Sequence, residues 1–598
     1  EAKYGVISQF PIMDSPRDPL ESYKLTSERS FEHFEVGYSK FGLKRYNITV
    51  ELAASKRTGL HRYTFPRTKH KAKIVIDLPH NLIVPNYAYT HRYLGGAIQS
   101  ISLNQVKGAA RYRGGWNQGG PYVVYFCSQF NVKAIEFETW ADHNFNFRNQ
   151  IYFDGTTHFG KIDGAILTFN VTENPVIISR VGISFISADQ ACNNAESEIP
   201  YWDFEKTKQE AVNAWQKELE KIFVEGGTDE LKTIFYSGLY RTMIMPSDRT
   251  GENPKWQSFD KNGNLIPHYG DFYTLWDTFR TTNPLFMLFQ QERSVDIVRS
   301  LIDIYQNEGY MPDGRSGLEN GITQGGSNGD MVVVETYLKK LGIDIIDWEL
   351  AYEALIKDAE VDPLDRGIYE GRRTIEYSAN DYSISLIAKD KYDDYIKYRK
   401  RARNWENLWN PNITFNGAKG FIMPRYQDGK YHNKLDIDGS HFAFYEATSW
   451  EYSLNIPFDI LKTKFGSGQD GIPGNDDSGA MGSWFAFNAI GLYPLAGTDI
   501  YLINSPHFNR VTINLSPRIT FTIMAHNLTN GSHVNPYVQS VKINGKNWRK
   551  TWFRHSNIAN GAIMELFMGP GPSKVWGVIG GNEDKIDVEY RVVPPSMM

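Results

Sequence analysis

Hydrophobic and polar residues alternate over short runs in the first third of the chain. Within residues 45–187, runs such as 46–52, 73–78 and 122–126 are rich in β-branched and aromatic residues, and Gly, Pro and Asn separate them. Many short strands at close spacing are typical of a sandwich of two sheets. We therefore predict a β-sandwich over residues 1–200.

The hydrophobic period changes to that of an α-helix after this region. Residues 204–223 place apolar side chains on one stripe, which predicts a connecting helix within a linker at 201–226. Helical patterns then fill residues 227–495 and predict an α/α toroid. Strand patterns return in residues 496–598, for which we predict a C-terminal β-rich region. The helices of the toroid are expected near 231–245, 275–290, 295–306, 331–341, 348–359, 381–389, 392–405 and 484–490.

Charge and aromatic content narrow the classes of partner. The 598-residue chain has a formal net charge of -5 and no evident basic stripe, which argues against nucleic acid or an anionic membrane as partner. We also find no unbroken apolar run long enough to span a bilayer. Aromatic residues make up 14% of the chain, a content that fits either sugar-binding faces or β-sandwich cores.

The compartment is suggested by a few weak signals. The chain has two cysteines, Cys127 and Cys192, and the sequence leaves open whether they form a disulfide. Asn-x-Ser/Thr sequons, for example at Asn47 and Asn412, would permit glycosylation on a secretory route. The opening Glu-Ala reads as a remnant of secretory processing. We therefore expect a secreted glycoprotein.

An acidic, glycine-bracketed loop is the first candidate for chemistry. The run Gly474-Asn475-Asp476-Asp477-Ser478-Gly479 directly precedes an apolar helical stretch, so it can present a carboxylate, that of Asp477, to a cavity. The same residues would also serve as a turn and helix N-cap, which from the loop alone is the better-supported interpretation.

A second acid, Glu376, completes a pair suited to glycoside hydrolysis. It lies in Thr374-Ile375-Glu376-Tyr377, and we expect it on a loop just before a helix that begins near residue 380. Glycoside hydrolysis needs one protonated carboxyl on the leaving oxygen and one carboxylate that acts on water or on the anomeric carbon. On its own, Glu376 would be read as a solvated or capping glutamate.

Two further segments offer groups that bind sugars or metals. In 275–280, Trp276 offers an aromatic face, and Asp277 and Arg280 lie three residues apart on one helical turn. A buried tryptophan beside a surface ion pair explains this segment about equally well. The segment 445–452 offers oxygen donors for calcium, although such a signal is weak by itself. Those donors are Glu446, Thr448 and Glu451.

Taken in their order along the chain, these four segments resemble the family 92 glycoside hydrolases, which are calcium-dependent, inverting exo-α-mannosidases. Further segments carry the resemblance: 30–33, 51–66, Gln324-Gly325-Gly326-Ser327-Asn328, Gly491-Leu492-Tyr493-Pro494 and Asn504-Ser505-Pro506.

The resemblance implies a multidomain α+β protein, in which the N-terminal β-sandwich packs on an (α/α)6 catalytic barrel and C-terminal β segments follow. It implies an exo-acting α-mannosidase for N-glycans or mannans, with Glu376 as general acid, Asp477 as general base and Ca2+ assisting ring distortion. Mannose-containing oligosaccharides or glycoproteins would be the partners. The remaining assignments are substrate binding by Trp276, Asp277, Arg280, Trp450 and Glu451, and metal binding by Glu446.

Two other functions fit parts of the pattern. The chain would be a non-catalytic mannose-binding or glycan-binding protein if the fold were kept without calcium, although both acids are retained. It would be an (α/α)6 hydrolase of another α-linked or phosphorylated sugar if the sugar-binding residues were used differently. The sequence leaves the preferred mannosidic linkage open.

Overall fold

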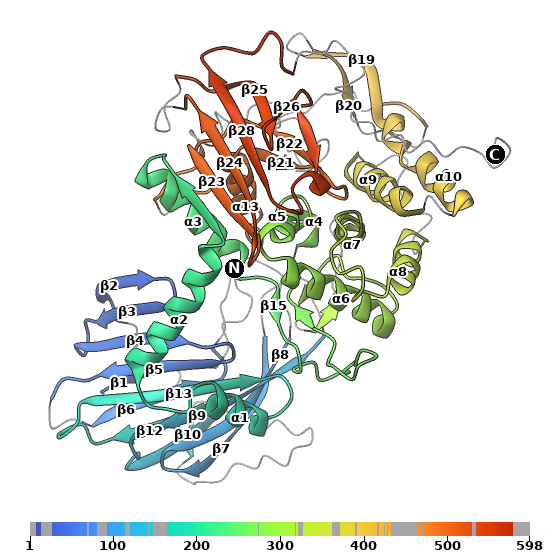
Figure 1. The fold of residues 1–598 in the computed structure, drawn as a ribbon. Helices are drawn as coiled ribbons and strands as arrows, with labels where there is room; N and C mark the ends of the chain where they lie inside the picture. Colours follow the sequence, from blue (N-terminus) through green and yellow to red (C-terminus); the bar gives the residue numbers. More distant parts are fainter. Residues whose placement is uncertain are drawn as a thin grey trace. The chain divides into compact units, whose positions relative to one another are not determined.

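The computed structural model divides into two compact units, which we describe separately (Figure 1). Unit 1 comprises residues 1–218, 251–257 and 316–319, and unit 2 comprises residues 219–250, 258–315 and 320–598. The structure describes residues 7–13, 27–67, 71–80, 92–113, 120–141, 144–146, 164–272, 274–316, 318–320, 327–360, 371–388, 391–415, 418–423, 425–426, 428–431, 461, 464–468, 470–528 and 534–577.

Unit 1 contains two antiparallel sheets. The strand order of the first is β1 (Ser8–Ile12), β6 (Ala72–Asp77), β12 (Gly164–Phe169), β10 (Glu136–Ala141) and β11 (Asn144–Asn146). The order of the second is β2 (Arg29–Glu35), β3 (Tyr38–Leu43), β4 (Ile48–Ala54), β5 (Thr58–Thr64), β13 (Val176–Ser184), β9 (Tyr122–Phe130), β8 (Gln105–Arg113) and β7 (Arg92–Ser102).

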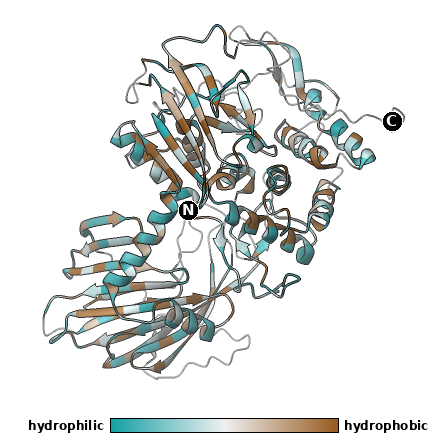
Figure 2. Cartoon of the chain, in the orientation of Figure 1, coloured by the Kyte–Doolittle hydropathy of each residue, from teal (hydrophilic) through white to brown (hydrophobic). Residues whose placement is uncertain are grey.

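The inward side chains of the two sheets form one core, which is what defines a sandwich. Val50 and Tyr63 from the larger sheet and Ile76 and Leu167 from the smaller one belong to the same buried cluster. Apolar and polar residues alternate along these strands in Figure 2, as expected when one face of each sheet is buried. The predicted β-sandwich is confirmed.

Helix α1 (Ala188–Glu198) packs against strands β9 and β13 of unit 1. A disulfide between Cys127 on β9 and Cys192 on α1 links the helix to the sheet, which answers a question that the sequence left open. Helix α2 (Phe204–Leu219) follows, and Phe204 at its start packs in a small buried cluster with Tyr38 and Leu60.

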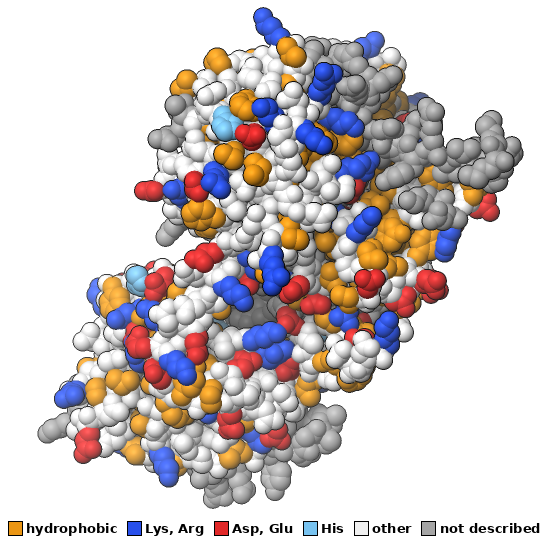
Figure 3. Space-filling view, in the orientation of Figure 1, with side chains coloured by type: hydrophobic (Ala, Val, Ile, Leu, Met, Phe, Trp, Pro, Cys, Tyr) orange, Lys and Arg blue, Asp and Glu red, His pale blue; other side chains and the backbone are white. Residues whose placement is uncertain are grey.

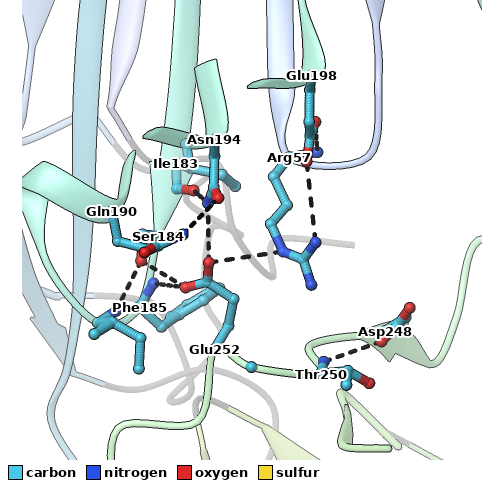
Figure 4. A network of polar contacts seen from close by, with 12 residues as sticks. Arg57, Ile183, Ser184, Phe185, Gln190, Asn194, Glu198, Asp248, Thr250 and Glu252 are labelled. Atoms are coloured by element: carbon cyan, nitrogen blue, oxygen red, sulfur yellow. Dashed lines mark hydrogen bonds and ion pairs between the residues drawn. The ribbon is translucent and has the colours of Figure 1, made fainter. Parts of the chain in front are cut away.

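A short segment far along the chain also belongs to unit 1. Glu252, within 251–257, is buried, and its carboxylate accepts hydrogen bonds from Ser184 Oγ (2.5 Å) and Asn194 Nδ2 (2.9 Å). The Nε atom of Arg57 lies 3.7 Å from the same carboxylate (Figure 4). A buried carboxylate is stable only when it is paired in this way, so these contacts anchor the segment to the sandwich.

Unit 2 contains the predicted helices. They are α3 (Asp229–Thr242), α4 (Leu275–Thr278), α5 (Thr282–Phe289), α6 (Gln291–Glu308), α7 (Asn328–Leu338), α8 (Trp348–Glu360), α9 (Gly371–Ile387), α10 (Tyr392–Arg401) and α13 (Ala480–Ile490). Helices α3 and α13 approach closely, because a Cβ on Gly482 would lie 2.8 Å from the backbone oxygen of Gly238.

Two of the expected helix bounds are wrong. The expected helix at 275–290 is divided into α4 and α5, and Thr281, which lies between them, hydrogen-bonds to Ser483 on α13 (2.7 Å). Helix α9 begins ten residues earlier than expected, at Gly371 rather than 381, so Glu376 lies on a helix and not on a loop. Buried serine and threonine residues concealed this helix in the sequence; Ser378, for example, donates its hydroxyl to the carbonyl of Thr374.

The C-terminal β strands belong to unit 2. Their main sheet has the order β14 (Ile222–Glu225), β23 (Arg510–Ser516), β24 (Ile519–His526), β28 (Ala562–Gly569), β25 (Tyr537–Ile543) and β26 (Lys546–Trp548). Another sheet contains β21 (Leu492–Pro494), β22 (Ile500–Ile503) and β27 (Trp552–Arg554). Two-stranded pairs are β15 (Ser247–Asp248) with β16 (Tyr269–Gly270) and β19 (Trp409–Phe415) with β20 (Ala418–Ile422).

Surface charge is mixed. Figure 3 shows acidic and basic side chains interspersed on the face in view. Within the described parts of the chain, none of the helices has the length and apolarity that crossing a membrane requires.

Candidate active site

Helix α9 presents the carboxyl group of Glu376 among donors from two other segments. The residue is 6% exposed. Arg280 Nη2 donates to Oε1 at 2.6 Å, and Asn328 Nδ2 donates to Oε2 at 3.2 Å. Because each oxygen accepts a hydrogen bond from a different segment, the position of the carboxyl group is fixed from both sides.

The carboxyl group of Asp313, which no sequence motif predicted, shares the donor Asn328 with Glu376. Its Oδ1 accepts hydrogen bonds from the backbone N–H (3.2 Å) and from Nδ2 (3.1 Å) of Asn328, the first residue of α7. Asn328 is fully buried and therefore joins two carboxyl groups, those of Asp313 and Glu376. No local motif marks Asp313 in the sequence, although Asn328 lies in a segment that carries the family resemblance.

The environment of Asp313 disfavours its charged form. The residue is 5% exposed, and Oδ2 has no hydrogen-bond partner among the residues that the structure describes. Burial and the neighbouring charge of Glu376 raise the pKa of Asp313 well above its ordinary value. A buried carboxyl group with a raised pKa beside a second acid is typical of sites that do acid–base chemistry.

The segment with Trp276, Asp277 and Arg280 lies against the same residues. Its first turn is held by a hydrogen bond from Leu275 N–H to the backbone oxygen of Asp313 (3.1 Å). Trp276 is buried and Asp277 is half-buried. Arg280 reaches the Glu376 carboxylate, so it contacts the predicted acid directly.

Hydrogen bonds connect this segment to the acidic loop. Thr274 Oγ1 donates to the backbone oxygen of Asp477 (3.3 Å) and to Ser478 Oγ (3.2 Å). Thr281 Oγ1 lies 3.4 Å from the carbonyl oxygen of Ala480. The structure thus places the backbone of Asp477 beside the segment that also reaches Glu376.

The backbone of the loop is strained at the predicted base. Asp477 has φ 38° and Ser478 has φ 60°, in the left-handed region that side chains other than glycine rarely adopt. Gly479 follows with φ 84°, and a Cβ there would lie 2.5 Å from Thr242 Cα on α3, so only glycine fits. Strain of this kind is concentrated at functional sites, where it directs a side chain into a set position.

The neighbouring Asp476 has the structural role that the sequence also suggested for this loop. Its Oδ1 accepts from the N–H of Gly482 in the first turn of α13 (3.0 Å), and its Oδ2 accepts from Arg241 Nε (2.7 Å). These contacts satisfy a helix N-terminus and neutralise the charge. The cap therefore involves the side chain of Asp476.

The proposed metal site cannot be built from the described residues. Glu446, Trp450 and Glu451 lie outside them. Among the residues described, no group of three His, Cys, Asp or Glu side chains is placed to hold a metal ion. The predicted calcium ligand Glu446 thus lies outside the described residues, and no catalytic step below runs through a metal.

Comparison with known proteins gives two family matches that together cover most of the chain. Residues 1–184 match the glycosyl hydrolase family 92 N-terminal domain, and residues 190–462 and 459–570 match the family 92 catalytic domain. A curated relative from Arthroderma benhamiae, described as an uncharacterized secreted glycosidase, is 32% identical over 544 residues. The match covers 73% of this chain and 65% of the relative, so the chain spans less than two thirds of that protein.

Solved structures have the same fold. A family GH92 inverting mannosidase of Bacteroides thetaiotaomicron matches with a TM-score of 0.78 at 22% identity, over 95% of this chain and 87% of that chain. A GH92 α-mannosidase of the same organism, solved with mannoimidazole, matches with a TM-score of 0.77 at 22% identity, over 92% and 82%. The predicted fold class, with its β-sandwich and (α/α)6 barrel, is confirmed.

Proposed function

This chain belongs to glycosyl hydrolase family 92, and we propose that it is an exo-acting α-mannosidase that works with inversion of configuration. The observation that carries the proposal is Glu376, a buried carboxyl group held by Arg280 and Asn328 within the part of the chain that matches the catalytic domain. The mannosidase descriptions of the two Bacteroides proteins support mannose as the sugar.

In this proposal Glu376 is the general acid. Cleavage of a glycosidic bond to an alcohol leaving group needs a proton on the leaving oxygen. A carboxyl group fixed on both oxygens by Arg280 and Asn328 loses little freedom when it delivers that proton, which is how positioned groups accelerate a reaction.

Asp477 is the proposed general base. Its strained backbone and its connection to Thr274 hold it near the Trp276 segment, while Asp476 secures the loop to α13. Inversion requires a water molecule between base and sugar, for which the two carboxyl groups must be about 6.5–9.5 Å apart with sugar bound. Trp276 and Asp277 would then bind the terminal mannose.

Calcium dependence is part of the proposal but rests on the family resemblance alone. A bound calcium ion would neutralise charge and favour a distorted sugar ring. Glu446 would be one of its ligands, while Trp450 and Glu451 would bind substrate.

We also propose that the protein is secreted and acts on mannose-containing oligosaccharides or glycoproteins. The Cys127–Cys192 disulfide supports an oxidising compartment, and the curated relative is described as secreted. No observation in the described residues favours a non-catalytic glycan-binding function or another sugar over this proposal.

The direct test is hydrolysis of an aryl α-mannoside and of manno-oligosaccharides, with calcium and then with EDTA, followed by NMR of the first sugar released. We expect β-mannose as the first product and loss of activity in EDTA. α-Mannose as the first product would refute inversion, activity retained in EDTA would refute calcium dependence, and no hydrolysis of any mannoside would refute the activity itself.

The role of Glu376 is tested with Glu376→Gln on two classes of leaving group. We expect a loss of about 10²–10⁴-fold on oligosaccharides, and a much smaller loss on substrates whose leaving group needs no proton. Glu360→Gln, which changes a partly exposed glutamate on α8 paired with Arg401, is the matched control and should leave both rates unchanged. An equal loss on both substrates would remove Glu376 from this role.

A further inference from the structure

We propose that Asp313 is a positioning residue for Glu376: the amide of Asn328 donates to both carboxyl groups, which form a pair coupled through their charges. This inference rests on the proposed function, because it assigns a role in the delivery of the proton by Glu376. None of the sequence motifs described above includes Asp313.

The geometry of the pair depends on one nitrogen atom. Asn328 Nδ2 lies 3.1 Å from Asp313 Oδ1 and 3.2 Å from Glu376 Oε2, so the two carboxyl oxygens are within hydrogen-bond distance of the same atom. Asn328 Oδ1 lies 3.5 Å from Asn380 Nδ2 on α9, a contact that favours the orientation in which the nitrogen faces the carboxyl groups. The Asn328 side chain thus links the positions of the two carboxyl groups.

The charges of the two groups are coupled as well. Two buried negative charges so close together repel each other, so ionisation of both carboxyl groups is unfavourable. Burial and the charge of Glu376 raise the pKa of Asp313 well above its ordinary value. The pair therefore keeps a proton on Asp313 to a higher pH than an exposed aspartate would.

A purely structural role for Asp313 is the alternative. Its Oδ1 accepts the N–H of the first residue of α7, as a helix-capping group does. That role leaves two observations unexplained. The Asn328 amide that donates to Asp313 also donates to Glu376, and the buried Oδ2 of Asp313 has no partner among the described residues. A protonated carboxyl group tolerates such a site better than an ionised one.

Other charged groups lie on the elements around the pair of carboxyl groups. Asp277 adds a further negative charge that raises the pKa of Asp313, after burial and Glu376. The remaining charged side chains are Arg280 on the α4–α5 turn, Asp330 on α7, Asp358 on α8, Asp381 on α9 with its partner Arg401, and Arg315 with its partner Glu308.

The test is Asp313→Asn, which keeps an oxygen acceptor for the α7 N–H but removes the titrating group. We measure the pH dependence of kcat/KM on a manno-disaccharide and on α-mannosyl fluoride, whose leaving group needs no proton. We expect the basic limb on the disaccharide to move to lower pH by about one unit or more, with the fluoride profile unmoved. An unmoved limb, or an equal loss on both substrates at every pH, overturns the inference.

Two further variants distinguish positioning from general destabilisation. Asp358→Asn is the matched control, because Asp358 accepts a hydrogen bond from Met311 N–H near Asp313; it should not move the basic limb. Asn328→Ala keeps both acids but removes the bridge, and should lower kcat on the disaccharide with little change in KM or in the rate on the fluoride. If Asn328→Ala instead raises KM with kcat unchanged, the bridge does not position the acid.

A readout that needs no activity separates this inference from the proposed function. When folding raises the pKa of a carboxyl group, the resulting stabilisation is fully present at a pH below the pKa of the unfolded state. This stabilisation is lost as the pH rises through the pKa of the folded state. Asp313→Asn should therefore become more stable relative to the wild type as pH rises through that range, even if no mannoside is hydrolysed. A stability difference that is independent of pH refutes the pair; an inactive wild type with this pH dependence refutes only the mannosidase.

Discussion

The two adjacent aspartates of the acidic loop should have separable roles, and substitution of each one tests the proposal. Asp477→Asn removes the proposed base. Asparagine has nearly the same size as aspartate and also tolerates the positive φ at this position. Loss of a general base typically costs about 10²–10⁴-fold in rate. We therefore expect a large loss of kcat with almost no change in thermal stability.

Asp476→Ala should give the opposite result. It removes a hydrogen bond to the Gly482 N–H, which costs about 0.5–2 kcal/mol for a helix-terminal acceptor. It also removes the partly exposed ion pair with Arg241, which contributes about 0.2–1 kcal/mol. In a unit as large as unit 2, a total of about 1–3 kcal/mol lowers the Tm by only about 1–4 °C.

Differential scanning calorimetry and initial rates on an aryl α-mannoside measure these two effects. Asp476→Asn is the matched control, because asparagine also caps helices well and only the charge facing Arg241 is lost. It should retain most of the activity. If Asp476→Asn loses as much activity as Asp477→Asn, or if Asp477→Asn unfolds earlier while it keeps its rate, the division of roles is wrong.

Two stability predictions concern unit 1. The Cys127–Cys192 bridge closes a loop with a sequence separation of 65, so its reduction should lower the free energy of unfolding by about 4 kcal/mol. Denaturation with and without reductant measures this difference. A Cys127→Ser/Cys192→Ser double variant is the control and should be insensitive to reductant. Burial opposes the ionisation of Glu51, but hydrogen bonds from Arg62 and Tyr38 outweigh it and hold its pKa below the ordinary value. This stabilisation is present above the unfolded pKa and is lost as pH falls through the folded pKa, so Glu51→Gln should weaken the acid sensitivity of the unfolding transition; an unchanged pH dependence would contradict it.

Periodic patterns predicted the elements whose buried faces are apolar. The sandwich strands follow a period of two, and Val50 and Ile76 are found in the core as that period requires. The start of α9 was missed because its buried positions include the polar residues Thr374 and Ser378, and the hydroxyl group of Ser378 donates to a backbone carbonyl within the folded helix. Burial of polar groups is a property of the three-dimensional structure that hydrophobic periodicity does not detect.

The residues of the candidate site that belong to a sequence motif could be predicted. Those that belong to the site only because the fold brings them close together could not. Glu376 and Arg280 were singled out from their motifs, but their contact was not foreseen. Asp313 has no motif of its own, and its importance comes from meeting Asn328 and the carboxyl group of Glu376. Likewise, the sequence contained both cysteines of the disulfide but not the proximity that joins them.

The anchoring of residues 251–257 to the sandwich limits how this protein can be dissected or recombined. A fragment that ends at residue 218 would contain all the strands of the two sandwich sheets and lack Glu252. Asn194 and Ser184 would then lose the carboxylate that they bind, and Arg57 would lose one of its two neighbouring carboxylates and keep that of Glu198. A chimaera joined at a single crossover would suffer the same loss, so an exchange of the N-terminal domain between relatives must carry this distant segment with it.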